Sequence, residues 1–347
     1  MVDNVVTSGS RPIPRMLLGI EFEDAELERV VETLLVGVED GLRHAVESVD
    51  PLLDDVAHHL VAAGGKRIRP LLVGLAAQFG TRPVCEEVTR AGVVVELTHL
   101  ATLYHDDVMD EAPVRRGAPS ANLRWSNSIA ILAGDHLFAR AADLAVDLGL
   151  DAVRLQARTF SRLVYGQIAE TSGPRDRDPI EHHLDVIAEK TGSLIGTSAK
   201  FGAMFSHASP ETIDALAEYG EVIGIAFQLS DDLLDIASES AQSGKTPGTD
   251  LREGIATLPV LYALADDATD DASVARLREL LSKGPLTDDA ELAEALELLR
   301  ESTAMKRARE TVRGYADRAR ALLEPLPDIP ARHALAALTD LIADRTS

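Results

Sequence analysis

The residues of this chain best suited to chemistry are two clusters of aspartates with the same spacing, Asp-Asp-x-x-Asp. They are Asp106, Asp107 and Asp110, and later Asp231, Asp232 and Asp235. Each cluster follows an apolar segment with helical periodicity and is expected near the end of a helix. Aspartates four apart share a helix face and repel each other, and negative charge at a helix carboxyl end opposes the helix dipole. A hard divalent cation, which takes carboxylate oxygens, would relieve both clusters.

Two arginines, Arg115 and Arg116, come shortly after the first cluster. Paired arginines are well suited to gripping phosphate oxygens, and Mg²⁺ typically binds one or two carboxylates together with substrate phosphates. A single acidic stretch of this kind is usually a solvated helix face, and an arginine pair is often an ordinary charged turn. Because the acidic pattern occurs twice, we favour a metal–diphosphate site with one cluster on each of two facing helices.

Composition favours an all-α protein with a large core. The chain has 347 residues, of which 46% are hydrophobic and only 4% aromatic, and its β-branched runs are short. The formal net charge of −23 disfavours nucleic acid and anionic lipid as partners. The single Cys85 fits a reducing cytosol, so we expect a cytoplasmic protein. No apolar run reaches the length of a transmembrane segment, and no signal peptide is recognisable.

The elements that must position these residues are helices. Residues 1–20 are aperiodic and are expected to form a loose arm, and residues 21–347 a single domain, because no shift in composition divides them. Ser120 is a candidate N-cap, and Gly134 is a candidate break between the helix that follows Ser120 and one over residues 135–148. We predict other helices over residues 24–48, 51–63, 71–79, 83–110, 152–170, 180–205 and 210–237, then four or five more.

Three interruptions of this pattern matter for function. The basic turn Gly64-Gly65-Lys66-Arg67-Ile68-Arg69-Pro70 opens the third helix. The helix over residues 180–205 should be distorted near Lys190-Thr191-Gly192, where a β-branched residue and a glycine interrupt it. A flexible loop is expected over residues 238–253, directly after the second acidic cluster.

In their order and content these motifs resemble those of the all-trans polyprenyl diphosphate synthases, members of the isoprenoid-synthase superfamily. The resemblance covers roughly residues 63–259. The matching elements are Gly64 to Pro70, Glu96 to Asp110, Arg115-Arg116-Gly117, Lys190-Thr191-Gly192, Phe227-Gln228-Leu229-Ser230-Asp231-Asp232-Leu233-Leu234-Asp235 and Gly244-Lys245.

The resemblance implies a large helical bundle around a central cavity, with the two Asp-rich helices facing each other. It implies an enzyme that condenses isopentenyl diphosphate with an allylic prenyl diphosphate, uses about three Mg²⁺ ions and pairs as a homodimer. The six aspartates would hold the metal ions. The allylic diphosphate would contact Arg115, Lys190 and Lys245, and the isopentenyl diphosphate would contact Lys66, Arg69, His99 and Arg116. Thr191 and Gln228 would lie beside the reacting carbons.

Elementary chemistry agrees with these roles. A diphosphate leaves carbon only if its growing charge is neutralised, and the carbocation left behind must be shielded from water. His99 lies seven residues before Asp106, two turns away on nearly the same helix face, although a lone helical histidine is more often a core residue. We expect Arg67 to be a surface charge, and Tyr104 and Trp125 to be packing residues.

The helix before Asp106 should line the channel for the growing chain. Its wall positions, one and two turns back, are Ala101, Thr102, Thr98 and Leu97. The resemblance implies that short-chain members carry bulky aromatics at the positions of Ala101 and Thr102, which are small here. A helical turn rises about 5.4 Å, close to one isoprene unit. We therefore predict a product longer than C20, with a geranylgeranyl or farnesyl diphosphate synthase as the alternative.

Three alternative functions fit the motifs of this chain less well. A terpene cyclase of the same fold usually lacks the Gly-Gly-Lys and Arg-Arg elements, which this chain has. A regulatory subunit of a two-component synthase loses motif residues, whereas both acidic motifs and their basic partners are present here. A di-iron carboxylate bundle needs paired Glu-x-x-His motifs, and we find none in place.

Overall fold

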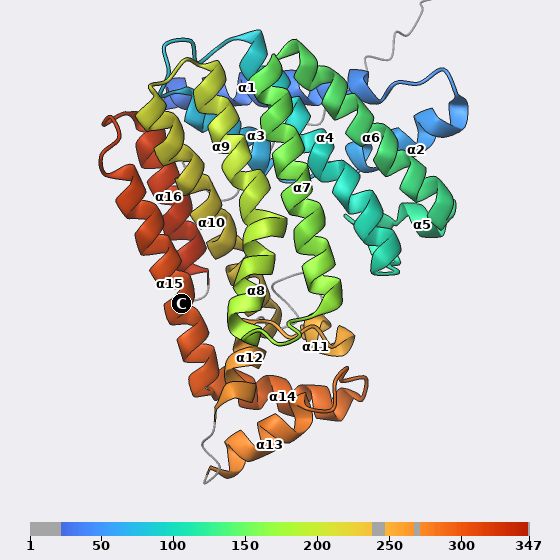
Figure 1. Ribbon diagram of the computed structural model, residues 1–347. Coiled ribbons are helices and arrows are strands. Elements are labelled where there is room, and N and C mark those ends of the chain that lie inside the picture. Colours follow the sequence, from blue (N-terminus) through green and yellow to red (C-terminus); the bar gives the residue numbers. More distant parts are fainter. Residues whose placement is uncertain (1–21, 238–246, 267–270, 346–347) are drawn as a thin grey trace, which may run out of the picture.

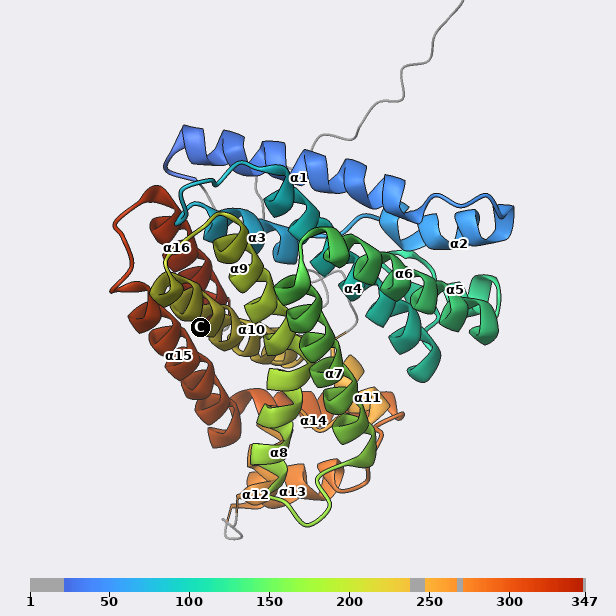
Figure 2. The same cartoon turned by 45° about the horizontal axis from the view of Figure 1, so that its top comes forward.

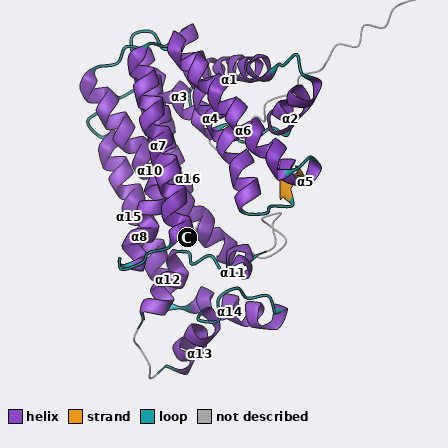
Figure 3. Ribbon diagram, turned by 45° about the vertical axis from the view of Figure 1, so that its right-hand side comes forward, coloured by secondary structure: helices purple, strands orange, loops and turns teal. Residues whose placement is uncertain are grey.

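The computed structural model describes residues 22–237, 247–266 and 271–345, and its regular structure is almost entirely helical (Figure 1). Within these ranges the strands are β1 (Val114–Arg115) and β2 (Ala118–Pro119), a short antiparallel pair beside α5 (Figure 3). The predicted all-α fold is confirmed. The predicted arm over residues 1–20 lies outside the described residues.

The helices follow one another along the chain with short connections. Their bounds are α1 (Ala25–Val46), α2 (Pro51–Ala62), α3 (Ile68–Ala77), α4 (Glu86–Met109), α5 (Ala121–Arg124), α6 (Asn127–Asp147), α7 (Leu150–Ser172), α8 (Pro179–Ile187), the π-helix η1 (Ala188–Gly192), α9 (Ser193–Phe205), α10 (Pro210–Ala237), α11 (Thr249–Glu253), α12 (Leu258–Ala265), α13 (Ala272–Leu281), α14 (Asp289–Glu301), α15 (Thr303–Leu323) and α16 (Pro330–Asp344).

Helices α1 and α2 lie across one end of a bundle of longer helices, and α12, α13 and α14 lie at the other end (Figures 1 and 2). Within the bundle, α4 packs against α6, α3, α1 and α9, and α10 packs against α9 and α15. Three clusters of buried apolar side chains fill the spaces between these helices. The two helices that carry the acidic clusters, α4 and α10, are thus both central elements of the bundle.

Aspartate–proline pairs start several helices where the sequence predicts. Asp50 caps α2 by accepting from the backbone N–H of Leu53 at 2.9 Å, and Pro51 occupies the first turn. Asp178 and Pro179 start α8 in the same way. Proline suits this position because its missing N–H would have no helical partner there.

Helix α6 corrects the prediction of a break at Gly134, because it runs without interruption from Asn127 to Asp147. A Cβ at Gly134 would lie 2.3 Å from His105 Nε2 and 3.1 Å from the carbonyl oxygen of Ala101. This glycine therefore allows α6 to pack closely on α4. The chain breaks earlier, at Trp125 and Ser126. Ser120 precedes α5 as predicted, but its hydroxyl donates to the Ala112 carbonyl and does not cap the helix.

Two other boundaries differ from the prediction. Helix α3 begins at Ile68, three residues before the predicted start, so Arg69 and Pro70 lie in its first turn. Of the loop predicted over residues 238–253, residues 238–246 lie outside the described residues, and residues 249–253 form the short helix α11. Asp235 accepts hydrogen bonds from the backbone N–H groups of Thr249 at 3.3 Å and Asp250 at 3.1 Å, a long-range contact that starts this helix.

The distortion predicted near Lys190 is confirmed as a single π-helical turn between α8 and α9. From this turn onward the chain lies very close to α10. A Cβ at Gly220 would lie 2.8 Å from the Cα of Gly196, and one at Gly224 would lie 3.0 Å from the Cα of Gly192. Four glycines thus let two backbones touch directly, which larger side chains would prevent.

This contact predicts a stability difference between two glycine-to-alanine substitutions. Gly220→Ala should destabilise the protein by about 1–3 kcal/mol, because the new methyl group overlaps backbone atoms that cannot easily move. Gly314→Ala, at a position of α15 with open space around it, should instead stabilise the helix by roughly 0.5–1 kcal/mol. Urea denaturation followed by circular dichroism would measure both, and equal effects would contradict the packing argument.

Candidate active site

The first acidic cluster lies at the carboxyl end of α4, with Asp110 as the C-cap residue. Asp107 is fully buried: its Oδ1 accepts from Arg115 Nε at 2.6 Å, and its Oδ2 has no hydrogen-bond partner. Asp106 and Asp110 are more open, and the cation that lowers their pKa most is Lys190. The three aspartates therefore have two environments, one ion-paired and buried, the other facing Lys190.

Burial raises the pKa of Asp106 to about 6, against the opposing effect of Lys190, and Asp110 raises it further. Burial also raises the pKa of Asp110 itself. A carboxylate with a raised pKa lacks enough positive charge around it, so the cluster has the oxygen ligands and the charge deficit that suit a divalent cation. Across the described ranges, no three His, Cys, Asp or Glu side chains already form a closed metal site.

The two arginines lie on the β1–β2 hairpin, one at the end of a strand and one in its turn. Arg116 and Gly117 form the two-residue turn, and both have positive φ, 54° and 78°, as in the type I′ turns that favour glycine or asparagine. Arg115 points to Asp107. Arg116 points away from it, and its guanidinium donates to the carbonyl oxygens of Gly64 and Leu60.

The basic turn before α3 contains two arginines with different surroundings. Arg67 corrects our expectation of a surface charge: it is buried and ion-paired with Glu39 and with Glu96, the latter at 2.8 Å. Its left-handed backbone, with φ of 50°, turns its side chain inward. Arg69 has a buried Nε without a hydrogen-bond partner, and burial lowers its pKa to about 10. Lys66 is exposed.

His99 lies among these cations. Burial lowers its pKa well below the usual value, and Arg69 and Arg116 lower it further. Its imidazole is therefore neutral at ordinary pH. Burial also lowers the pKa of Arg116, although Glu96 opposes the effect. Positive charge is thus in excess around Arg69, His99 and Arg116, because Glu96 is already paired with Arg67. This is the opposite of the acidic cluster nearby.

The π-helical turn carries the next two candidates. Lys190 Nζ forms an ion pair with Glu170 of α7. Thr191 Oγ1 donates to Gln228 Oε1 of α10 at 3.3 Å, and Gln228 Nε2 donates to Asp232 Oδ1 at 2.9 Å. Hydrogen bonds therefore run from Thr191 through Gln228 to Asp232 of the second acidic cluster. The neighbouring Lys190 acts on Asp106 and Asp110 of α4 through its charge. Lys245 lies outside the described residues.

The second acidic cluster is less open than the first. Asp231 lies 3.4 Å from Arg345 Nη1 near the end of α16. Asp232 is buried, and burial raises its pKa to about 7, although the hydrogen bond from Gln228 opposes this. Asp235 uses its carboxylate to hold the start of α11. His183 of α8 lies 3.8 Å from Asp232 Oδ2, and burial lowers its pKa to about 4.

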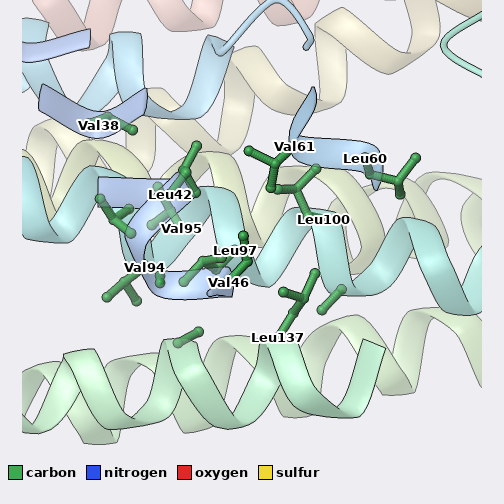
Figure 4. Close-up of a cluster of buried hydrophobic side chains, with 14 of the residues drawn as sticks. Val38, Leu42, Val46, Leu60, Val61, Val94, Val95, Leu97, Leu100 and Leu137 are labelled. Carbon is green, nitrogen blue, oxygen red and sulfur yellow. The ribbon is translucent and has the colours of Figure 1, made fainter. Parts of the chain in front are cut away.

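The four channel positions lie along α4 before the aspartates. Leu97, Thr98 and Ala101 are buried, and Thr102 is partly exposed. Leu97 lies among apolar side chains that include Val94, Leu100 and Leu137 (Figure 4). A cavity of about 330 Å³ between α1, α3 and the start of α4 is lined by Val30, Leu34 and Cys85. It is not the predicted channel, because Cys85 and Asp106 are 21 residues apart, about 30 Å along the helix.

Several residues of this region were not predicted from the sequence. Glu96 was recognised only as part of a motif, yet it is buried and pairs with Arg67. Glu170 and Arg345, which hold Lys190 and Asp231, carried no sequence signal because both contacts join distant parts of the chain. Tyr104 is a packing residue as predicted: it is fully buried, and its hydroxyl bonds the backbone of α2.

Comparison with known proteins identifies the family. Residues 50–299 match the model of the family described as polyprenyl synthetase. The chain is 51% identical to the nonaprenyl diphosphate synthase of Mycobacterium tuberculosis, over 95% of this chain and 98% of the relative. A crystal structure of geranylgeranyl pyrophosphate synthase from Corynebacterium glutamicum, complexed with calcium and isoprenyl diphosphate, has a TM-score of 0.86 and 49% identity, covering 94% of this chain and all of the other.

A decaprenyl diphosphate synthase from Rhodobacter capsulatus has a TM-score of 0.82 and 34% identity, covering 93% of this chain and 99% of the other. No described helix is long and apolar enough to cross a bilayer. The family match covers both acidic clusters, the arginine pair and the π-helical turn. The chain therefore belongs to the polyprenyl synthetase family and is a prenyl diphosphate synthase.

Proposed function

We propose that this enzyme is a Mg²⁺-dependent trans-prenyltransferase that condenses isopentenyl diphosphate with an allylic diphosphate. The observation that carries the proposal is the pairing of two groups with unbalanced charge. Burial raises the pKa of Asp106 and Asp110, whereas burial and neighbouring arginines lower the pKa of Arg69, His99 and Arg116. Magnesium ions and two diphosphates would balance both groups.

Asp106 and Asp110 would hold metal ions from α4, and Asp231, Asp232 and Asp235 would hold a further ion from α10, about three ions in all. Their oxygen donors and raised pKa values fit a hard cation. Asp107 would contribute a metal ligand through Oδ2, which has no hydrogen-bond partner, while its Oδ1 orients Arg115. When bound, the ions neutralise the charge that develops on the departing diphosphate.

The chain's own residues would sort the two substrates. Arg115 and Lys190, with Lys245, would bind the allylic diphosphate beside the aspartates. Lys66, Arg69, His99 and Arg116 would bind isopentenyl diphosphate away from the aspartates. Glu96 lies 3.9 Å from Arg116 Nη2 but is already paired with Arg67. A diphosphate that must not leave would therefore have no metal cage there. His99, being neutral, can donate one hydrogen bond without adding a charge.

Catalysis would proceed by ionisation, condensation and elimination. As the carbon–oxygen bond of the allylic substrate breaks, Arg115 and Lys190 would stabilise the leaving diphosphate. The oxygen dipoles of Thr191 and Gln228 would lie beside the allylic cation, and the Thr191–Gln228 hydrogen bond would fix their orientation. The π electrons of isopentenyl diphosphate then form the new carbon–carbon bond, and loss of a proton restores the double bond.

We infer a product longer than C20. Ala101 and Thr102 are small residues one turn before the aspartates, and the nonaprenyl and decaprenyl synthases are named for long products. The similarity to a geranylgeranyl pyrophosphate synthase keeps a C20 product as the alternative. The second alternative is a regulatory subunit of a two-component synthase, and the acidic and basic motifs present in this chain disfavour it. A relative 38% identical is named as component 2 of a heptaprenyl diphosphate synthase.

We also propose a cytoplasmic homodimer in which residues 21–347 form one domain. Helices α6 and α7 pack side by side and expose a group of large apolar side chains that a second subunit would cover. They are Ile131, Leu132, Phe160, Val164, Tyr165 and Ile168. In support of one domain, α10 contributes to two of the three buried clusters and joins them.

The first prediction tests the reaction itself. The purified chain alone, given farnesyl diphosphate, labelled isopentenyl diphosphate and Mg²⁺, should form labelled products, and a chelator should abolish them. Asp106→Asn should lower kcat on the order of 100-fold or more, because the leaving diphosphate loses its counter-charge. Glu111→Gln, at an exposed neighbouring position, is the matched control. Incorporation only after addition of a second protein would favour the two-component alternative.

The second prediction separates two neighbouring arginines. Arg69→Gln should raise the KM for isopentenyl diphosphate on the order of 10–100-fold with little loss of stability, since charge-assisted hydrogen bonds to phosphate are strong. Arg67→Gln should instead destabilise the fold by about 3–5 kcal/mol, because it leaves Glu96 buried without its partner. Steady-state kinetics and urea denaturation would distinguish the two. A KM effect on the allylic substrate alone would contradict the assignment of Arg69.

The third prediction concerns product length. Ala101→Phe should shorten the product, because an aromatic ring would close the channel one turn before Asp106. Ala101 is fully buried, so the larger side chain could also disturb packing, and Thr102→Phe, at a partly exposed position, is the second variant. Chromatography of the dephosphorylated products would measure their length. Products of unchanged length from both variants, with activity retained, would refute the channel assignment.

A further inference from the structure

Arg162 of α7 connects three elements around the π-helical turn. Its Nε and Nη2 donate to both carboxylate oxygens of Glu189, each at 2.9 Å. Its Nη1 and Nη2 donate to both carboxylate oxygens of Glu221, at 3.1 and 2.7 Å. Glu189 lies in η1 and Glu221 in α10, so one guanidinium joins α7, the π-helical turn and the helix of the second acidic cluster.

Both glutamates that Arg162 contacts lie close in sequence to proposed site residues. Glu189 directly precedes Lys190 and Thr191, the residues proposed to act on the allylic substrate. Glu221 lies two turns before Gln228 on α10 and faces the other side of the same turn: a Cβ at Gly192 would lie 3.1 Å from its carbonyl oxygen. Arg162 therefore links the π-helical turn that carries Thr191 to the helix that carries Gln228.

The π-helical turn is irregular and is held by contacts with its neighbours. It replaces the regular hydrogen-bond pattern of an α-helix and occurs mostly as a single turn, often at functional sites. Helix α7 approaches it closely, since a Cβ at Gly166 would lie 2.9 Å from Glu189 Cβ and 2.8 Å from Lys190 Cγ. Arg162, Gly166 and Glu170 recur every four residues along α7, so one helix face contacts Glu189, the backbone of the turn and the Lys190 ammonium in succession.

Resting on the function proposed above, we propose that Arg162 is a positioning residue for the allylic site. By gripping Glu189 and Glu221 at once, it holds the π-helical turn in the register that directs Lys190 to the diphosphate and Thr191 to the reacting carbons. Arg162 touches neither substrate. Its effect on the reaction passes through Lys190 and Thr191.

The alternative is a pair of ordinary surface ion pairs. The side chains of Arg162, Glu189 and Glu221 are 35%, 22% and 38% exposed, and ion pairs of this exposure contribute little to stability. The chain contains a matched example away from the site. Arg276 of α13, 36% exposed, forms the same two-pronged contact with Glu294 and a second pair with Glu279.

The experiment compares Arg162→Lys with Arg276→Lys in the full-length enzyme. Lysine keeps the charge but cannot make the four-bond fork. Arg162→Lys should lower kcat on the order of 10–100-fold, as misplacement of reacting groups by about 1 Å does. The KM for isopentenyl diphosphate should change by less than about twofold, because that site is not involved. Arg276→Lys should leave kcat and both KM values unchanged. The thermal midpoints of both variants should stay close to that of the wild type.

A double-mutant cycle with Lys190→Gln distinguishes a positioning role of Arg162 from a purely structural one. The quantity compared is the reduction in kcat caused by Arg162→Lys. If Arg162 acts through Lys190, Arg162→Lys should reduce kcat much less in the Lys190→Gln background than in the wild type. Equal reductions in both backgrounds, or an unchanged kcat in Arg162→Lys, would overturn the proposal. If the wild-type enzyme itself does not elongate an allylic diphosphate, the proposed function fails. That result is distinct from failure of the positioning role.

Discussion

The direct contact of two backbones, at Gly192 and Gly196 on one side and Gly220 and Gly224 on the other, determines much of the site. Because no side chain separates them, the π-helical turn and α10 have little freedom to shift relative to each other. This closeness allows a short side chain such as Thr191 to reach Gln228. The glycines thus hold the Thr191 hydroxyl and the Gln228 amide in place, as rigid elements hold the side chains of a designed site.

Around this scaffold, side chains of like charge are grouped together and partly buried, which is locally unfavourable. Carboxylates collect at the ends of α4 and α10, where burial raises the pKa of Asp106 to about 6 and that of Asp232 to about 7. Guanidinium groups collect at the basic turn, where burial lowers the pKa of Arg69 to about 10. Proteins seldom tolerate such segregation except where a ligand completes it. The acidic clusters therefore have too little positive charge around them, and the basic turn too little negative charge. Metal ions and substrate diphosphates would supply these charges.

The sequence predicted the helices and the acidic clusters because their periodic patterns are local. It also predicted the distorted turn near Lys190, since a β-branched residue followed by glycine disfavours a regular helix. The predictions from sequence were wrong where one residue type can serve two structural purposes. Gly134 could break a helix or permit close packing, and only the proximity of His105 decides between them. Arg67 and Arg69 differ in role because of a left-handed φ at Arg67, and no pattern in the neighbouring residues revealed it.

The β1–β2 hairpin has a consequence for how the two substrates are held. Arg115 turns toward Asp107, and Arg116 turns toward Gly64 and Leu60, although the two residues are adjacent. If they bind different diphosphates, a single peptide bond separates the anchors of the two binding sites. Covalent geometry then keeps the Cα atoms of the two anchors about 3.8 Å apart. Thermal motion of the surrounding helices would then move both anchors together. The reacting carbons of the two substrates would keep their spacing, while the rest of the pocket adapts to a lengthening product.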